Sequence, residues 1–255
     1  MSINVILQAR LSSTRLPGKV LKDIVNKPML ALQIERIKRA RFIDNIIVAT
    51  SVEQADDAIE QLCNKLAIPC FRGSLNDVLD RFYLTQLAFP SDHIVRLTGD
   101  CPLIEPTIID QVIDLHLEQA ADYTSNCLTP CLPDGLDVEV FTHKALTVSW
   151  QQAVKPSERE HVTQYMRNHS ELFRLINFQY QPDLSKHRWT VDEPSDFTLI
   201  KTIYENLYPI NPNFTMQDVL ALLKKQPELS DLNSQFNRNQ GLENSIAYDK
   251  EQGFE

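Results

Sequence analysis

The residues best suited to chemistry lie in segment 8–19, where three cations occur among small residues. Arg10, Arg15 and Lys19 are separated by serine and threonine, and a Pro-Gly pair precedes the lysine. A loop of this composition can turn backbone N–H groups and fixed cations toward one point, which makes an anion site. Arginine offers forked donors that match a phosphate group, and lysine offers a point charge. The segment suggests a polyphosphate site, and a solvated basic turn between a strand and a helix is the equally open alternative.

Two carboxylates follow apolar segments that read as strands. Asp100 comes directly after Gly99 at the end of one segment, and Asp192 ends another. Ligands of open α/β sheets sit outside the carboxyl ends of the strands, and carboxylate oxygens suit Mg²⁺, which also takes substrate phosphate oxygens. We therefore predict that Asp100 and Asp192 hold a metal ion together. For Asp100 taken alone, an ordinary turn cap is the better interpretation, and Asp196 is interpreted as complementing the dipole of the helix that follows.

These candidate residues need a scaffold that brings strand ends together. Strand and helix patterns alternate through the first half of the chain, which predicts a parallel sheet with helices on both faces. The predicted strands are 4–8, 45–50, 69–72, 93–98, 122–126, 136–141, 173–180 and 188–191. The predicted helices are 28–39, 53–66, 76–87, 106–119, 144–152, 157–168, 195–207 and 215–225. We expect one α/β domain over residues 1–225, followed by a weakly patterned, polar C-terminal extension over 226–255.

Composition narrows the class of protein. The chain has 255 residues, of which 43% are hydrophobic and 23% charged, as is ordinary for a globular protein. Its net charge of −9 argues against general binding to nucleic acid or to an anionic membrane. The sequence shows no apolar run long enough for a membrane span and no signal peptide. With the odd count of five cysteines, this predicts reduced thiols and a cytoplasmic location.

Three motifs together resemble one known family. They are Ala9-Arg10-x-x-Ser13-Thr14-Arg15-Leu16-Pro17-Gly18-Lys19, Gly99-Asp100-x-Pro102-Leu103-Ile104 and Thr190-Val191-Asp192-x-Pro194-x-Asp196. The pattern is similar to that of the cytidylyltransferases that activate acidic sugars, which include the 3-deoxy-manno-octulosonate and acylneuraminate enzymes. Further motifs resemble the spore-coat polysaccharide biosynthesis branch of that superfamily. These are Phe71-Arg72-Gly73-Ser74, Val78-Leu79-Asp80-Arg81-Phe82, Pro133-Asp134-Gly135-Leu136-Asp137-Val138-Glu139 and Glu158-Arg159-Glu160-His161.

The resemblance implies a three-layer α/β/α fold of the nucleotide-diphospho-sugar transferase type, with a mostly parallel, mixed sheet, in a homodimer. It implies a reaction in which CTP activates a sugar, expected to be acidic, to give a CMP-sugar and pyrophosphate for surface polysaccharide or glycan biosynthesis. It implies Mg²⁺ on Asp100 and, by position, on Asp192, with Arg15, Lys19 and Asp100 as the catalytic residues. The octulosonate enzymes have an acidic residue where this chain has Cys101, so their sugar is not carried over.

The same resemblance implies which residues bind the nucleotide and which bind the sugar. Those expected at the nucleotide are Gln8, Ala9, Arg10, Ser13, Arg15, Lys19, Gly73, Asp77, Arg81 and Gly99. Those expected at the sugar are Asp134, Gly135, Asp137, Glu139, Glu160 and His161. Simpler interpretations stay open for some of them: His161 as a helix-surface histidine, at least one of the three strand carboxylates as merely exposed, and Asp77 with Arg81 as a surface ion pair.

Two other functions remain open at this stage. One is a glycosyltransferase of the same fold that uses a nucleotide-sugar donor, and the other is a non-catalytic nucleotide-binding protein. The cations of the first loop suit a departing pyrophosphate, and no clean Asp-x-Asp motif lies at a predicted strand end. Both features favour the nucleotidyltransferase.

Overall fold

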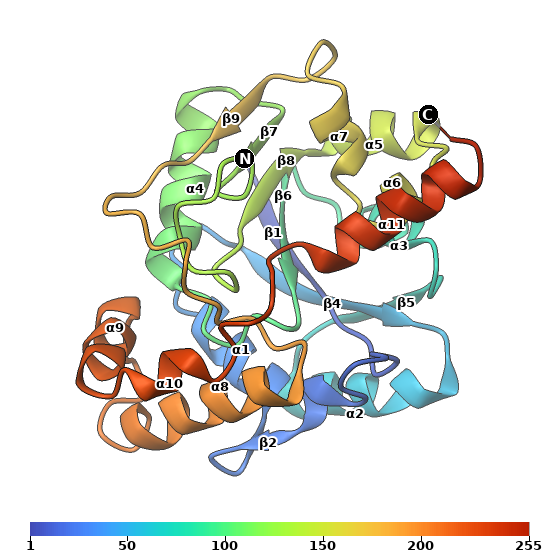
Figure 1. Cartoon of the computed structure of the whole chain (residues 1–255). Coiled ribbons are helices and arrows are strands. Elements are labelled where there is room, and N and C mark those ends of the chain that lie inside the picture. The colour runs from blue at the N-terminus through green and yellow to red at the C-terminus, as the bar shows by residue number, and fades with distance from the viewer. Residues whose placement is uncertain (255) are drawn as a thin grey trace.

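The computed structural model describes residues 1–254, and a seven-stranded sheet lies at its centre (Figure 1). The strand order is β5-β4-β1-β6-β8-β7-β9. The bounds are β1 Ile3–Gln8, β4 Asn45–Ser51, β5 Cys70–Gly73, β6 His93–Thr98, β7 Tyr123–Ser125, β8 Glu139–Thr142 and β9 Leu175–Asn177. The strands from β5 to β6 are parallel, β8 is antiparallel to both of its neighbours, and β9 is parallel to β7. The predicted α/β fold with a mostly parallel, mixed sheet is confirmed.

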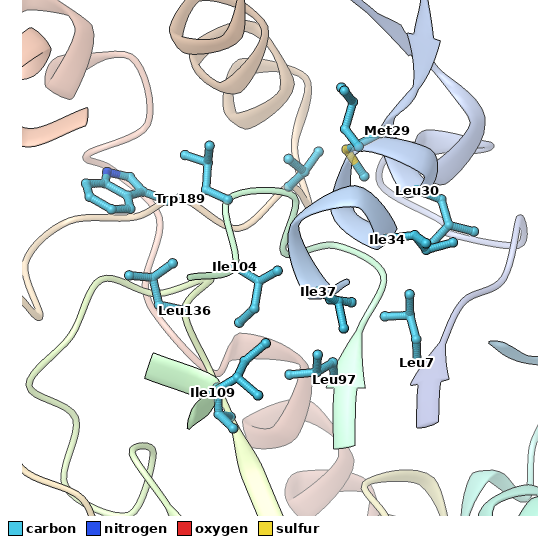
Figure 2. Close-up of a cluster of buried hydrophobic side chains, with 14 of the residues drawn as sticks. Leu7, Met29, Leu30, Ile34, Ile37, Leu97, Ile104, Ile109, Leu136 and Trp189 are labelled. Carbon is cyan, nitrogen blue, oxygen red and sulfur yellow. The ribbon is translucent and has the colours of Figure 1, made fainter. Parts of the chain in front are cut away.

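Side chains leave the sheet in both directions and form two apolar cores. In β1, Val5 and Leu7 belong to one core and Ile6 to the other, as the two-residue period of a strand requires. Figure 2 shows part of the larger core, where Leu7 lies near Ile34 and Ile37 of the first helix. The helices that contribute to the larger core are α1 Met29–Ile37, α2 Asp57–Leu66, α4 Pro106–Glu118, α8 Pro194–Leu207 and α9 Met216–Lys225. Those of the smaller core are α3 Val78–Ala88, α5 His143–Gln152 and α7 Gln164–Asn168.

The helices described here do not include one that is both long and apolar enough to cross a bilayer. A short hairpin, β2 Asp23–Ile24 and β3 Lys27–Pro28, connects the first loop to α1. Before it, the turn η1 covers Lys19–Leu21, and a second such turn, η2, covers Gln54–Asp56 ahead of α2.

The prediction of a strand over 188–191 is wrong. The segment makes a single parallel bridge, from Arg188 to Asp134, and joins no sheet. Its backbone N–H groups bond to loops instead: Trp189 donates to Asp134 O at 2.6 Å, and Val191 donates to Asp100 O at 2.8 Å. The apolar run signals burial correctly, but no neighbouring strand is there to pair with it.

The single helix predicted over 157–168 is also wrong. It is divided into α6 Pro156–Glu160 and α7, and Val162 between them has a φ of 54°. A β-branched residue rarely adopts this left-handed conformation. The break turns His161 out of the regular helix, and His161 lies at the cavity described below.

The weakly patterned segment after Gln226 contains two unpredicted helices, α10 Glu228–Asp231 and α11 Gln240–Glu251. In Figure 1 the red α11 lies beside α6, and the two helices are in contact. Asn233 donates to Arg188 O at 3.0 Å and to Asp196 Oδ1 at 2.7 Å, while buried Asp249 accepts from Ser157 N at 3.1 Å. The segment is therefore bonded to the rest of the chain at both ends, and the division at residue 225 stays a prediction.

Candidate functional site

A cavity of about 360 Å³ opens at the carboxyl ends of β1 and β6. It gathers most of the residues that the sequence singled out, from six separate segments. Those that line it are Gln8, Ala9, Arg10, Ser13, Arg15, Lys19, Arg81, Gly99, Asp100, Asp134, Asp137, Glu139, Glu160, His161 and Asp192. Gly73, Asp77 and Gly135 lie outside its walls.

The loop after β1 is held by a hydrogen bond within its own backbone and by another to a side chain outside it. Gly18 N donates to Leu11 O at 3.0 Å, and Leu11 N donates to Asp56 Oδ1 at 2.7 Å. Gly18 has a φ of 69°, which glycine adopts without steric cost. The η1 turn starts at the next residue, so Lys19 points inward and is only 8% exposed.

Lys19 lies between the two predicted metal carboxylates. Its Nζ is 2.8 Å from Asp192 Oδ1 and 3.5 Å from Asp100 Oδ2, and it donates to Val191 O at 2.6 Å. Burial by itself would lower the pKa of Lys19, but the charges of Asp100 and Asp192 outweigh it and raise the pKa. Lys19 is therefore a fixed ammonium ion at the meeting point of three segments.

Asp100 is held ionised by its neighbours. Burial alone would raise its pKa, but Lys19 and the hydroxyl of Thr98, which donates to Oδ1, lower it. Gly99 permits the backbone approach that puts the carboxylate here, since a Cβ at this position would lie 3.0 Å from Gln8 O. The turn-cap interpretation of Asp100 does not account for its contact with Lys19.

Asp192 has two further cationic neighbours. Arg15 Nη2 is 3.0 Å from Asp192 Oδ2, and Arg15 Nη1 is 3.2 Å from Glu193 Oε1. Arg188 Nη2 is 3.5 Å from Asp192 but only 2.9 Å from Asp196 Oδ2. Asp196 is fully buried and also accepts the N–H groups of Asp192 and Glu193, so it orders the start of α8.

The donor chemistry of this pair fits a magnesium ion. Asp100 and Asp192 share one ammonium group, so hard oxygen ligands of both converge on one region. Mg²⁺ is commonly bound by one or two carboxylates together with substrate phosphates and water. Residues 1–254 contain no group of three or more His, Cys, Asp or Glu arranged to hold a metal ion. A metal ion at this pair would therefore need oxygen ligands from the nucleotide or from water.

A further part of the cavity wall is acidic. Asp134 accepts from Arg188 Nη1 at 3.1 Å, and Asp137 forms an ion pair with Arg238 of the C-terminal segment. Burial, and then the charge of Asp137, raise the pKa of Asp134 to about 7, although the two arginines act in the other direction. Burial likewise raises the pKa of Asp137. A cavity with this wall can offer both hydrogen-bond donors and acceptors to a polyhydroxylated ligand.

Glu139 is not merely an exposed strand carboxylate. It is 6% exposed, forms an ion pair with Arg96, and accepts from the hydroxyls of Tyr123 and Thr163, each at 2.6 Å. Burial would raise its pKa, but Arg96 and these hydroxyls lower it. Glu139 is thus a fixed negative charge in the cavity wall.

The surface ion pair suggested for Asp77 and Arg81 does not form. Arg81 is 2% exposed and donates to Ser74 O, and burial lowers its pKa to about 10. Asp77 caps α3 by accepting from Asp80 N at 2.9 Å and pairs with Arg159, whose Nε is 3.0 Å away. Gly73 leaves room for Arg81, because a Cβ there would lie 3.0 Å from Arg81 Cγ.

Sequence reasoning missed several wall residues. Arg96 lines the cavity and is a charged residue inside an apolar run, which is a usable signal, whereas Arg188 also lines it but follows Lys186 and His187. Arg167 gave no such signal. Five more come from the C-terminal segment, whose pattern was weak; they are Asn237, Asn239, Gln240, Gly241 and Leu242.

Comparison with known proteins places this geometry in context. Residues 4–222 match a family model described as cytidylyltransferase. The chain is 36% identical over 231 residues to the spore coat polysaccharide biosynthesis protein SpsF of Bacillus subtilis, covering 88% of this chain and 94% of that protein. It is 31% identical over 197 residues to the 3-deoxy-manno-octulosonate cytidylyltransferase of Francisella tularensis subsp. novicida, covering 73% and 77%. A solved structure of a cytidylyltransferase from Leptospira borgpetersenii matches with a TM-score of 0.87 and 32% identity, covering 93% of this chain and all of that one.

Proposed function

Because the chain belongs to the cytidylyltransferase family, we propose that it joins CTP to a sugar and releases pyrophosphate. The observation that carries the proposal is the convergence of Lys19, Asp100 and Asp192 in one cavity at the carboxyl ends of the strands. A cation and two carboxylates in one place match the needs of a metal-bound triphosphate better than those of a neutral ligand.

In this reaction a sugar hydroxyl attacks the α-phosphorus of CTP, and the bond to the β-phosphate oxygen breaks. Catalysis of such a step is mainly positioning and stabilisation of charge. Lys19 and Arg15 are cations of the loop formed by residues 8–19, which we call the phosphate loop. We assign both to the leaving pyrophosphate. Asp100 and Asp192 would hold Mg²⁺, which when bound neutralises charge on phosphate oxygens. Lys19 and Arg15 now contact carboxylates, so nucleotide binding would replace those partners with phosphate oxygens.

We propose an acidic sugar as the acceptor. Arg167 lines the cavity next to Glu139 and makes no ion pair with any residue that the structure describes. It is therefore a cation available to a carboxylate of the sugar. Asp134, Asp137 and Glu160 line the same cavity and are suited to sugar hydroxyls.

We further propose that the CMP-sugar serves surface polysaccharide or glycan biosynthesis and that the protein acts as a cytoplasmic homodimer. The polysaccharide role is supported by the similarity to the Bacillus subtilis protein. Light scattering during size-exclusion chromatography tests the dimer: a mass near twice the 29.3 kDa of one chain is expected, and a mass near one chain would reject it.

A pyrophosphate-release assay tests the reaction. The protein is incubated with CTP, Mg²⁺ and each member of a panel that includes 3-deoxy-manno-octulosonate, N-acetylneuraminate and their neutral counterparts. We expect release that requires CTP and one acidic sugar, with UTP and ATP as matched controls. CTP binding without release would instead indicate a nucleotide-binding protein, and sugar transfer from a CMP-sugar would indicate a glycosyltransferase.

A further inference from the structure

Ser245 of α11 connects the C-terminal segment to two residues of the cavity wall. Its Oγ is 2.9 Å from His161 Nε2 and 2.8 Å from Glu160 Oε2. It also lies 3.1 Å from Gly241 O on its own helix. Ser245 is outside residues 4–222, the part of the chain that the family model matches.

The hydroxyl group of Ser245 has one proton to donate. Glu160 and the carbonyl of Gly241 can only accept, so the proton belongs to one of them, and the charged carboxylate is the stronger partner. The Ser245 oxygen must therefore accept from His161, which places the ring proton on Nε2. Glu160 Oε2 is 3.8 Å from His161 Nε2, too far for a direct hydrogen bond, so the hydroxyl mediates the contact.

This proton arrangement leaves the other ring nitrogen free. In a neutral imidazole with hydrogen on Nε2, Nδ1 carries the lone pair. His161 lines the cavity, and its Nδ1 neither bonds to a residue in the described chain nor belongs to the buried unpaired atoms. The lone pair is thus accessible to a ligand. The contact differs from a hydrolase triad, because the serine proton points toward the carboxylate and not toward the imidazole.

We propose that Ser245 is a positioning residue that fixes His161 as the Nε2–H tautomer, so that Nδ1 accepts the proton of the attacking sugar hydroxyl. The inference rests on the proposed cytidylyl transfer. The sugar oxygen forms a bond to the α-phosphorus, and pyrophosphate leaves with the electron pair of the broken bond. The hydroxyl proton moves to Nδ1, and the resulting imidazolium keeps its Nε2–H bond to Ser245.

The charges around His161 suit this exchange. Burial lowers the pKa of His161 and keeps the ring neutral and able to accept a proton. Glu160 of α6 and Glu139 of β8 favour the charged ring, while Arg96 of β6 and Arg167 of α7 oppose it. The Ser245 hydroxyl, on α11, connects the new charge to Glu160. Proton acceptance by such a base contributes about 10²–10⁴-fold to a rate.

Two measurements on Ser245→Ala test the inference. Nitrogen NMR of the ¹⁵N-histidine-labelled full-length protein, assigned with His161→Gln, reports the tautomer directly. We expect Nε2–H in the unsubstituted protein and in Ser245→Thr, which keeps the hydroxyl, and a mixture of tautomers in Ser245→Ala. With CTP, Mg²⁺ and the sugar that supports release, Ser245→Ala should lower kcat about tenfold and shift the acidic limb of the pH profile, with CTP affinity unchanged. Ser234→Ala, which removes an exposed hydroxyl of the same segment, is the matched control.

Each of the other outcomes overturns a stated part of the proposal. An Nδ1–H tautomer in the unsubstituted protein would overturn the hydrogen-bond assignment. An unchanged kcat and pH profile in Ser245→Ala would overturn the proton-acceptor role. If the tautomer responds to Ser245→Ala but no sugar of the panel releases pyrophosphate, the hydrogen-bond assignment stands, and the proposed function falls together with the proton step.

Discussion

Replacing Lys19 with alanine tests the assignment of the phosphate loop most directly. Lys19 is nearly buried and joins three segments through Val191 O, Asp192 and Asp100. If it stabilises the leaving pyrophosphate, Lys19→Ala should reduce kcat far more than CTP affinity. Loss of one preorganised donor to developing charge costs about 10²–10³ in kcat, or about 2.7–4 kcal/mol. The remaining cations of the loop, Arg10 and Arg15, should keep the loss of affinity smaller than the loss of kcat, because their guanidinium groups still offer donors to phosphate oxygens.

The same substitution has a cost in stability that can be worked out from the contacts. Breaking a fully buried ion pair costs about 3–5 kcal/mol. The carboxylates left behind are 27% exposed for Asp100 and 22% for Asp192, and Asp192 keeps Arg15 at 3.0 Å. The expected loss is therefore smaller, about 1–3 kcal/mol, mainly from the hydrogen bond to Val191 O and the unpaired Asp100.

The assay separates the two effects. Continuous pyrophosphate release at saturating CTP, Mg²⁺ and the sugar that supports release gives kcat, and isothermal titration gives the Kd for CTP. Urea unfolding measures stability, so a loss of activity through misfolding is detected. Lys22→Ala, which removes the exposed lysine of the same loop, should leave kcat unchanged. Equal losses of kcat and affinity in Lys19→Ala, or no loss of either, would refute the assignment to the leaving group.

Three further predictions concern stability and metal dependence. Gly135→Ala should lower the free energy of unfolding by about 2–4 kcal/mol in urea titrations, because φ is +105° and a Cβ would lie 2.5 Å from Thr190 N. Gly241→Ala has open space and should be neutral or slightly stabilising, so equal effects of the two would contradict the packing argument. The pKa of Asp134 rises from 3.8 to about 7, so the stability that Asp134 contributes to the fold is full below pH 3.8 and is lost as pH rises through 7. Asp134→Asn should therefore flatten the plot of unfolding free energy against pH in that range. An unchanged slope would show that Asp134 is not its source. EDTA should abolish pyrophosphate release, and adding Mg²⁺ should restore it. EDTA should leave the Tm of the nucleotide-free protein unchanged, because Lys19 already pairs with Asp100 and Asp192. A lowered Tm would reveal a structural metal ion.

The site residues that could be predicted from the sequence are those marked by a pattern in their own neighbouring residues. Asp100 and Asp192 were predictable because each follows an apolar run, and Lys19 because its cationic loop follows another; the ends of parallel strands meet at one edge of a sheet. The prediction of a strand before Asp192 is wrong, but the segment is buried and reaches the same edge of the sheet. Asp192 therefore lies beside Lys19 as expected. Local apolar patterns report burial more reliably than they report which hydrogen bonds the backbone makes.

The residues that sequence reasoning could not place depend on long-range contacts. Ser245 reaches His161 from 84 positions away, and Arg238 reaches Asp137 from 101 positions away. Neither arginine nor serine is unusual in a polar segment, so no pattern marks them. Asp77 shows the opposite case: its spacing suggested a pair with Arg81, but Arg159 from α6 occupies its carboxylate. Helical spacing lists possible neighbours, and tertiary contacts choose among them.

The contacts of Lys19 also link the binding of nucleotide to the binding of the metal ion. Asp100 and Asp192 would repel each other if both were charged and unpaired, and the ammonium group between them removes that penalty. A phosphate group competing for Lys19 would leave both carboxylates in need of a cation, which a nucleotide that arrives with its metal ion would supply. The binding of nucleotide and metal should therefore be mutually dependent, since each satisfies the charge that the other exposes. On this reasoning Lys19 does more than attract phosphate: it helps to hold Asp100 ionised, and it keeps Asp100 and Asp192 close together until the substrate would take over its role.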